Sequence, residues 1–89
     1  MTITVEKIDD TTFQVTVEAR TKTTHTVSVS PAYLEKLTGG RTPPETLVRK
    51  SFEFLLERES NTSILRRFDL PVIQTYFPDY ERTIRQMLS

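Results

Sequence analysis

Residues 42–59 read TPPETLVRKSFEFLLERE, and this stretch decides the fold. Thr42 followed three positions later by Glu45 matches a capping box, in which each side chain bonds the backbone N–H of the other residue. Apolar residues then recur at helical spacing as far as Leu56. The stretch therefore predicts a long central helix that has Thr42 as its N-cap and runs to about Glu59.

The apolar residues of this helix cover more than one of its faces. They span about 200° around the helix axis, whereas a helix at the surface of a globular protein needs an apolar stripe of only ~100°. They are Leu47, Val48, Phe52, Phe54, Leu55 and Leu56. Because one sheet face covers only part of that arc, we expect the C-terminal third to fold back over the rest. Its apolar groups include Ile64, Leu65, Phe68, Ile73, Tyr76, Phe77 and Tyr80.

The first third of the chain alternates between apolar and polar side chains, as half-buried strands do. Asp9-Asp10-Thr11 is a turn signal between the first two runs, and residues 20–23 form a second connection. The pattern predicts three antiparallel strands in a meander. The residues that share the buried face are Ile3 and Val5, then Phe13, Val15, Val17 and Ala19, then His25, Val27 and Val29.

Shorter signals place the remaining helices. Ser30 and Pro31 predict the start of a short helix, because Ser is a good N-cap and Pro fits the first helical position. Gly39 is suited to end that helix. Pro71 and Pro78 divide the C-terminal third into short helical pieces. The predicted fold class is therefore α+β: an N-terminal three-stranded antiparallel β-meander, a short helix, a long central helix and short C-terminal helices.

Composition limits the classes of function. The 89 residues predict a single domain over residues 1–89, because chains this short rarely divide. Twelve basic and twelve acidic side chains give no net charge, so the surface as a whole is not expected to attract nucleic acid or anionic lipid. No apolar run is long enough for a bilayer and no signal-peptide pattern is present. We expect a cytoplasmic protein without a membrane partner.

The residues offer little for catalysis. The chain has no cysteine and one histidine, His25, which is in phase with Val27 and Val29 and is expected on the core side. A lone histidine lacks the partners that a general base or a metal site needs. We therefore expect no enzyme, and predict no catalytic residue, no metal ligand and no cofactor.

Four arginines of the C-terminal third are candidates for a basic patch beside aromatic residues. Arginines interleaved with aromatic side chains can hold single-stranded nucleic acid. The same aromatic residues are needed to close a small core, so both interpretations stay open. The residues are Arg66, Arg67, Arg82 and Arg85, near Tyr76 and Tyr80.

The middle third resembles the ribbon-helix-helix fold of dimeric DNA-binding repressors and antitoxins. It has a polar strand ending at Ser30, a short helix, a glycine turn and a second helix that starts at Thr42. The resemblance implies a DNA-binding regulator that acts as a dimer, with one strand from each copy paired as a ribbon in the major groove. It implies that Thr26 and Ser28 read bases and that Thr42 contacts phosphate.

Three longer segments of sequence carry a second resemblance. Residues 51–59 (SFEFLLERE), 64–70 (ILRRFDL) and 76–81 (YFPDYE) are together similar to a family of short, uncharacterised prokaryotic proteins. This resemblance implies a shared fold and no activity.

The favoured hypothesis is a non-catalytic protein-interaction or regulatory module, monomeric or weakly dimeric, whose protein partner is unknown. The runner-up is the ribbon-helix-helix type of DNA-binding regulator. The expected contact surfaces are the exposed edge of the third strand and any part of the central helix that stays uncovered.

Overall fold

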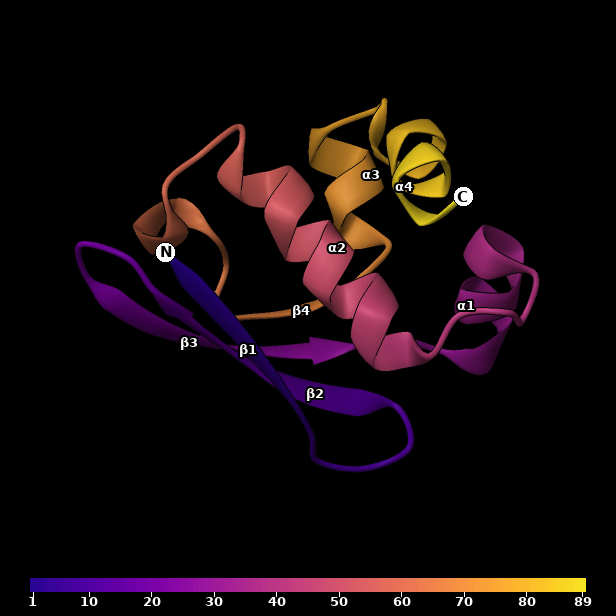
Figure 1. Cartoon of the computed structure of the whole chain (residues 1–89), viewed down its shortest axis with the longest axis horizontal. Coiled ribbons are helices and arrows are strands. Elements are labelled where there is room, and N and C mark those ends of the chain that lie inside the picture. Colours follow the sequence, from indigo (N-terminus) through magenta and orange to yellow (C-terminus); the bar gives the residue numbers. More distant parts are fainter.

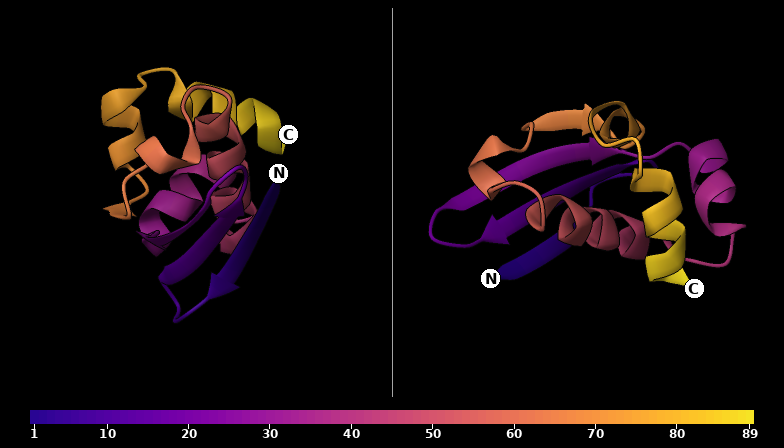
Figure 2. Two further views of the ribbon diagram at one scale, coloured as in Figure 1. Left: turned by 90° about the vertical axis from the view of Figure 1, so that its left-hand side faces the viewer. Right: turned by 90° about the horizontal axis from the view of Figure 1, so that it is seen from above.

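A four-stranded sheet with helices on one of its faces forms the whole molecule, as a computed structural model of residues 1–89 shows (Figure 1; Figure 2). The strands are β1 (Thr2–Lys7), β2 (Thr12–Glu18), β3 (Lys22–Ser28) and β4 (Arg67–Asp69), in the spatial order β1-β2-β3-β4. The first three pair antiparallel, and β4 runs parallel to β3. The predicted α+β class and the antiparallel meander are confirmed, but the sheet is larger and mixed.

The helices are short. They are α1 (Pro31–Thr38), α2 (Pro44–Leu56), α3 (Val72–Tyr76) and α4 (Tyr80–Leu88), with a 3-10 turn η1 (Asn61–Ser63) after α2. α2 lies across the middle of the helical layer (Figure 1). No helix has both the length and the apolar character needed to pass through a bilayer.

α1 begins and ends as its sequence predicts. The Ser30 hydroxyl accepts a hydrogen bond from the Tyr33 N–H at 3.1 Å, and Pro31 occupies the first helical position. Gly39 ends the helix with φ of 67°, a left-handed conformation that costs little only for a residue without Cβ.

The prediction of a long central helix with a capping box is wrong. α2 has 13 residues and ends at Leu56; its N-cap is Pro43, without a side-chain hydrogen bond. A residue that precedes proline is driven out of the helical region, so Pro43, which precedes Pro44, cannot be the first helical residue after a Thr42 cap. Pro43 is extended, with φ −61° and ψ 147°, and the helix starts one residue later.

The prediction that the third strand has an exposed edge is also wrong. β4 covers it, with Val27 opposite Phe68 and Ser28 opposite Asp69. Closer to the start of β3, the Asn61 side chain donates to the Thr21 carbonyl at 2.7 Å. A parallel neighbour needs a long crossover, which α1 and α2 provide here. The free edges of the sheet are therefore β1 and β4.

α2 is buried on two sides, as its wide apolar arc predicts. Towards the sheet, the Phe52 ring lies 5.3 Å from the His25 ring and 6.1 Å from the Phe68 ring, centroid to centroid. On the other side, the Phe54 ring meets Phe77 at 5.9 Å and Tyr80 at 5.2 Å, both edge to face. The C-terminal third therefore folds back over α2, and the predicted fold-back is confirmed.

Replacing a buried aromatic residue of α2, with an exposed one as control, tests this packing. Phe54→Ala should lower the free energy of unfolding by about 3–5 kcal/mol, because the Phe54 side chain, on α2, is fully buried against α4. The control Tyr76→Ala should cost about 0.5 kcal/mol or less, because Tyr76 is largely exposed. Urea unfolding followed by circular dichroism measures both, and equal losses would contradict this arrangement of the core.

Candidate functional site

An apolar groove opens between the end of α2, the segment that leads into β4, and α3. It has a volume of about 210 Å³, and eight of its ten lining residues are hydrophobic. Leu55, Phe68 and Ile73 form its buried part, and Leu65 and Tyr76 stand at its rim. The groove thus combines residues from three separate parts of the chain.

The rim residues expose large apolar surfaces to solvent. Leu65 keeps 47% of its surface exposed, and Tyr76 keeps 65%. The other large hydrophobic residues that are exposed are Met1 and Ile8, neither of which lines the groove. Leu65 and Tyr76 were expected to cover α2, and the structure instead turns both towards solvent beside a hollow.

Glu59 is the one charged residue that lines the groove. Burial raises the pKa of its carboxyl above the ordinary value, because the apolar walls solvate the charged form poorly. Glu59 forms no ion pair within the chain. A cation supplied from outside would find there a carboxylate that has no partner.

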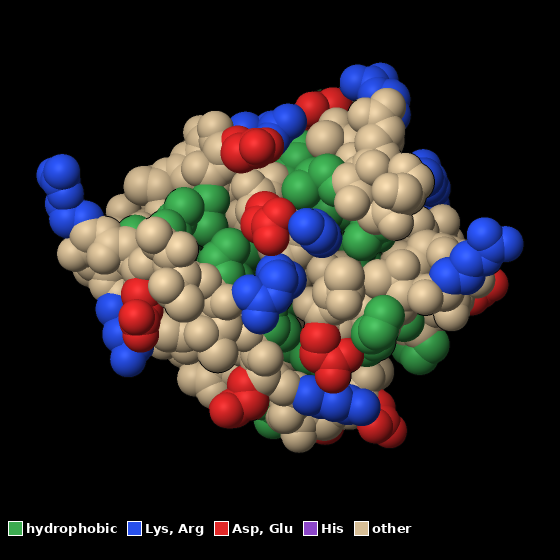
Figure 3. Space-filling model, viewed as in Figure 1, with side chains coloured by type: hydrophobic (Ala, Val, Ile, Leu, Met, Phe, Trp, Pro, Cys, Tyr) green, Lys and Arg blue, Asp and Glu red, His purple; other side chains and the backbone are tan.

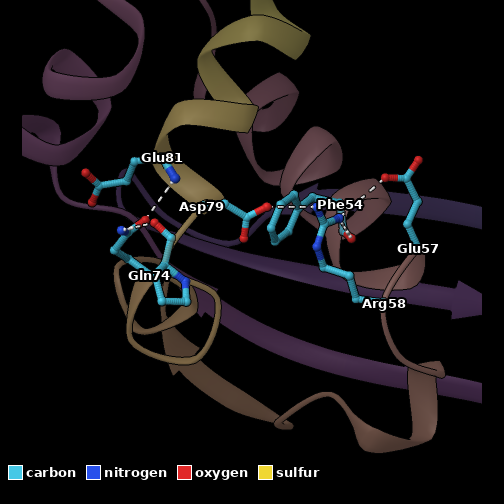
Figure 4. A network of polar contacts seen from close by, with 7 residues as sticks. Phe54, Glu57, Arg58, Gln74, Asp79 and Glu81 are labelled. Atoms are coloured by element: carbon cyan, nitrogen blue, oxygen red, sulfur yellow. Dashed lines mark hydrogen bonds and ion pairs between the residues drawn. The ribbon is translucent and has the colours of Figure 1, made fainter.

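Polar contacts on the far side of α3 fix the position of that short helix (Figure 4). The Gln74 amide accepts from the Glu81 N–H at 2.9 Å and donates to the Pro78 carbonyl at 2.6 Å, which ties α3 to the start of α4. The Arg58 guanidinium lies 3.6 Å from the centre of the Phe54 ring and donates to Asp79 at 3.1 Å. These contacts attach the turn before α4 to the end of α2, so one wall of the groove is held in place.

A buried chain of hydrogen bonds holds the opposite wall. Asn61 Nδ2 donates to the Thr23 hydroxyl at 2.9 Å, and that hydroxyl lies 2.9 Å from His25 Nε2. His25 Nδ1 lies 2.8 Å from the Leu65 carbonyl, which can only accept. Nδ1 therefore carries a proton, and in the neutral imidazole, which burial favours, Thr23 donates to Nε2. This neutral tautomer connects β3 to the segment that carries Leu65.

His25 gives this wall a pH dependence. Burial lowers the pKa of His25 below its ordinary value of 6.5; the charge of Arg66 acts in the same direction, and the bond to Leu65 opposes them. The unfolded chain therefore takes up the proton first as the pH falls. Stability should be complete above pH ~6.5 and should decline below it, by at most ~1.4 kcal/mol per pH unit for one proton.

Urea unfolding between about pH 7.5 and 5 tests the role of His25, the only residue whose ordinary pKa lies in that window. The wild-type chain should lose stability over this range. His25→Gln should be less stable at neutral pH and should lack that decline. The same dependence of stability on pH in the wild-type chain and in His25→Gln would contradict this role of His25.

The residues assigned from the DNA-binding resemblance do not lie together. Thr26 and Ser28 are on the open face of β3, which β2 and β4 flank on both sides. Thr42 precedes α2, which packs on the opposite face of the sheet. A ribbon made with a second copy would require β3 to give up one of these neighbours. No group of three or more His, Cys, Asp or Glu side chains is placed to hold a metal ion.

The four arginines do not form one patch. Arg66 and Arg67 are at β4, whereas Arg82 and Arg85 are on α4, which lies well apart from β4 (Figure 1). On the face shown in Figure 3, basic and acidic side chains alternate. The nearby Tyr80 is fully buried, and its hydroxyl lies 2.6 Å from that of Ser51.

Comparison with known proteins gives no match: no family model, no curated protein and no solved structure corresponds to this chain. The groove has apolar walls, one unpaired carboxylate and two exposed apolar side chains at the rim, which suits binding of an apolar group that carries a positive charge nearby.

Proposed function

We propose that this chain is a non-catalytic protein-interaction module that binds an apolar side chain of a protein partner in the groove. The observation that carries the proposal is the exposure of Leu65 and Tyr76 on either side of a preformed apolar hollow. Monomeric proteins rarely leave large apolar side chains gathered at such a place unless something binds there.

The size of the groove favours a side chain over a free small molecule. Small-molecule sites usually enclose about 300–1,000 Å³. The groove, at about 210 Å³, suits one or two apolar side chains. Glu59 adds a preference for a lysine or arginine next to the apolar residue, since that cation would pair a carboxylate that is otherwise alone.

Selection from a phage-displayed library of random peptides tests the proposal. The enriched peptides should share a large apolar residue near a lysine or arginine. Leu65→Asp and Tyr76→Asp should each weaken their binding by about tenfold or more, because a charge at the rim disfavours entry of an apolar group. Fluorescence anisotropy with synthetic copies of the peptides measures the change in affinity.

Ile8→Asp is the matched control, because Ile8 is also an exposed large hydrophobic residue but lies outside the groove. It should leave peptide binding unchanged. The proposal fails if the library yields no peptide, or if the selected peptides bind the two rim variants as tightly as the wild-type chain.

A further inference from the structure

The hydrogen bonds of β4 define which of its backbone groups are free. The Thr26 N–H donates to the Arg66 carbonyl at 2.7 Å, and the Leu70 N–H donates to the Ser28 carbonyl at 2.9 Å. In a regular strand successive residues point their N–H and C=O groups to opposite sides. Residues 66, 68 and 70 therefore face β3, and the backbone groups of Arg67 and Asp69 point away from the sheet as an unpaired edge.

The side chains along this edge carry opposite charges. Arg67 and Asp69 are both exposed on the open face of the sheet, and Phe68 between them is buried on the helical face. Arg67 forms no ion pair within the chain, and Asp69 accepts one hydrogen bond, from the Ser28 hydroxyl. One carboxylate oxygen of Asp69 thus stays available.

The other edge of the sheet is less accessible. The Arg49 guanidinium, from α2, donates to the Ile3 carbonyl on β1. An incoming strand would have to displace this charged group, a device that natural sheets use against pairing at their edges. No side chain blocks the backbone groups of Arg67 and Asp69 on β4 in the same way.

We propose that β4 pairs antiparallel with β4 of a second copy of this chain, so that the two sheets join into one. The segment Arg67-Phe68-Asp69 is complementary in charge to a second, antiparallel copy of itself when the two copies of Phe68 stand opposite each other. Arg67 of each copy lies opposite Asp69 of the other, and these two residues exchange their free backbone hydrogen bonds. Opposite charges stand directly across from each other on the open face, which stabilises a cross-strand pair.

The same register carries apolar contacts beyond the strand. It brings Leu65 of each copy beside Pro71 of the other, where α3 begins. This inference goes beyond the proposed function, with which it shares only the rim residue Leu65.

Analytical ultracentrifugation of the full chain and of charge variants tests the pairing, between roughly 1 and 500 µM, where small interfaces associate. The wild-type chain should pass from monomer to dimer in this range. Arg67→Asp and Asp69→Arg should each weaken the dimer by about tenfold or more. In either variant, residues 67 and 69 carry the same charge, and they face each other at two places in the dimer. Both substitutions together should restore it, as should an equimolar mixture of the two single variants.

Lys22→Asp is the matched control: it makes the same change of charge on the same sheet face, in the β2–β3 hairpin, and should leave the dimer intact. A monomer at every concentration would overturn the proposal, as would a dimer that neither single variant weakens or that Lys22→Asp weakens equally. If the chain stays monomeric while selected peptides still bind in the groove, the second copy is excluded and the proposed function stands. A charge-dependent dimer that binds no peptide would support the pairing of β4 and contradict the proposed function.

Discussion

Burial of α2 on two opposite sides is the constraint on which the other features of this structure depend. The three antiparallel strands cover the side that carries Phe52, and they leave the side that carries Phe54 without a partner. The C-terminal third covers that side. That segment has to leave the end of α2, turn back and return over the helical layer, where Phe77 and Tyr80 meet Phe54.

The path of that return creates both the groove and the new sheet edge. After η1 the chain passes beside β3, where the His25 and Asn61 hydrogen bonds attach it, and for three residues it becomes β4. α3 follows at once. Gln74 ties it to the start of α4, and Arg58 ties the turn before α4 to the segment after α2. The hollow between these two fixed walls is the groove, and the strand beside it is left with one unpaired side.

Sequence alone predicts the features that depend on neighbouring residues. The β1–β3 meander follows from an alternation sustained over many positions, and α1 follows from Ser30, Pro31 and Gly39, whose effects act within one turn of helix. The capping-box prediction was wrong because Pro44 keeps Pro43 out of the helical conformation, and this steric effect outweighs the Thr42–Glu45 pattern. β4 escaped prediction because Arg67–Asp69 is too short for a periodic signal and is a strand only through pairing with residues about 40 positions earlier.

The groove could not be predicted from the sequence for a related reason. Leu65 and Tyr76 look like core residues, and their exposure depends on how a five-residue helix is held against α2 and α4. That orientation comes from contacts between separate parts of the chain: Gln74 on α3 accepts from the Glu81 N–H on α4, and Arg58, just after α2, donates to Asp79, just before α4. By contrast, the placement of His25 on the core side follows directly from its phase in β3, although its bond to Leu65 does not.

The phase of β4 is the central claim, because it determines which backbone groups are free at the edge beside the groove. Amide hydrogen exchange followed by NMR in dilute solution measures it residue by residue. The N–H groups of Phe68 and Leu70, which face β3, should be protected, and those of Arg67 and Asp69 should exchange rapidly. Protection of Arg67 and Asp69 with rapid exchange of Phe68 would mean the opposite phase and would contradict the account.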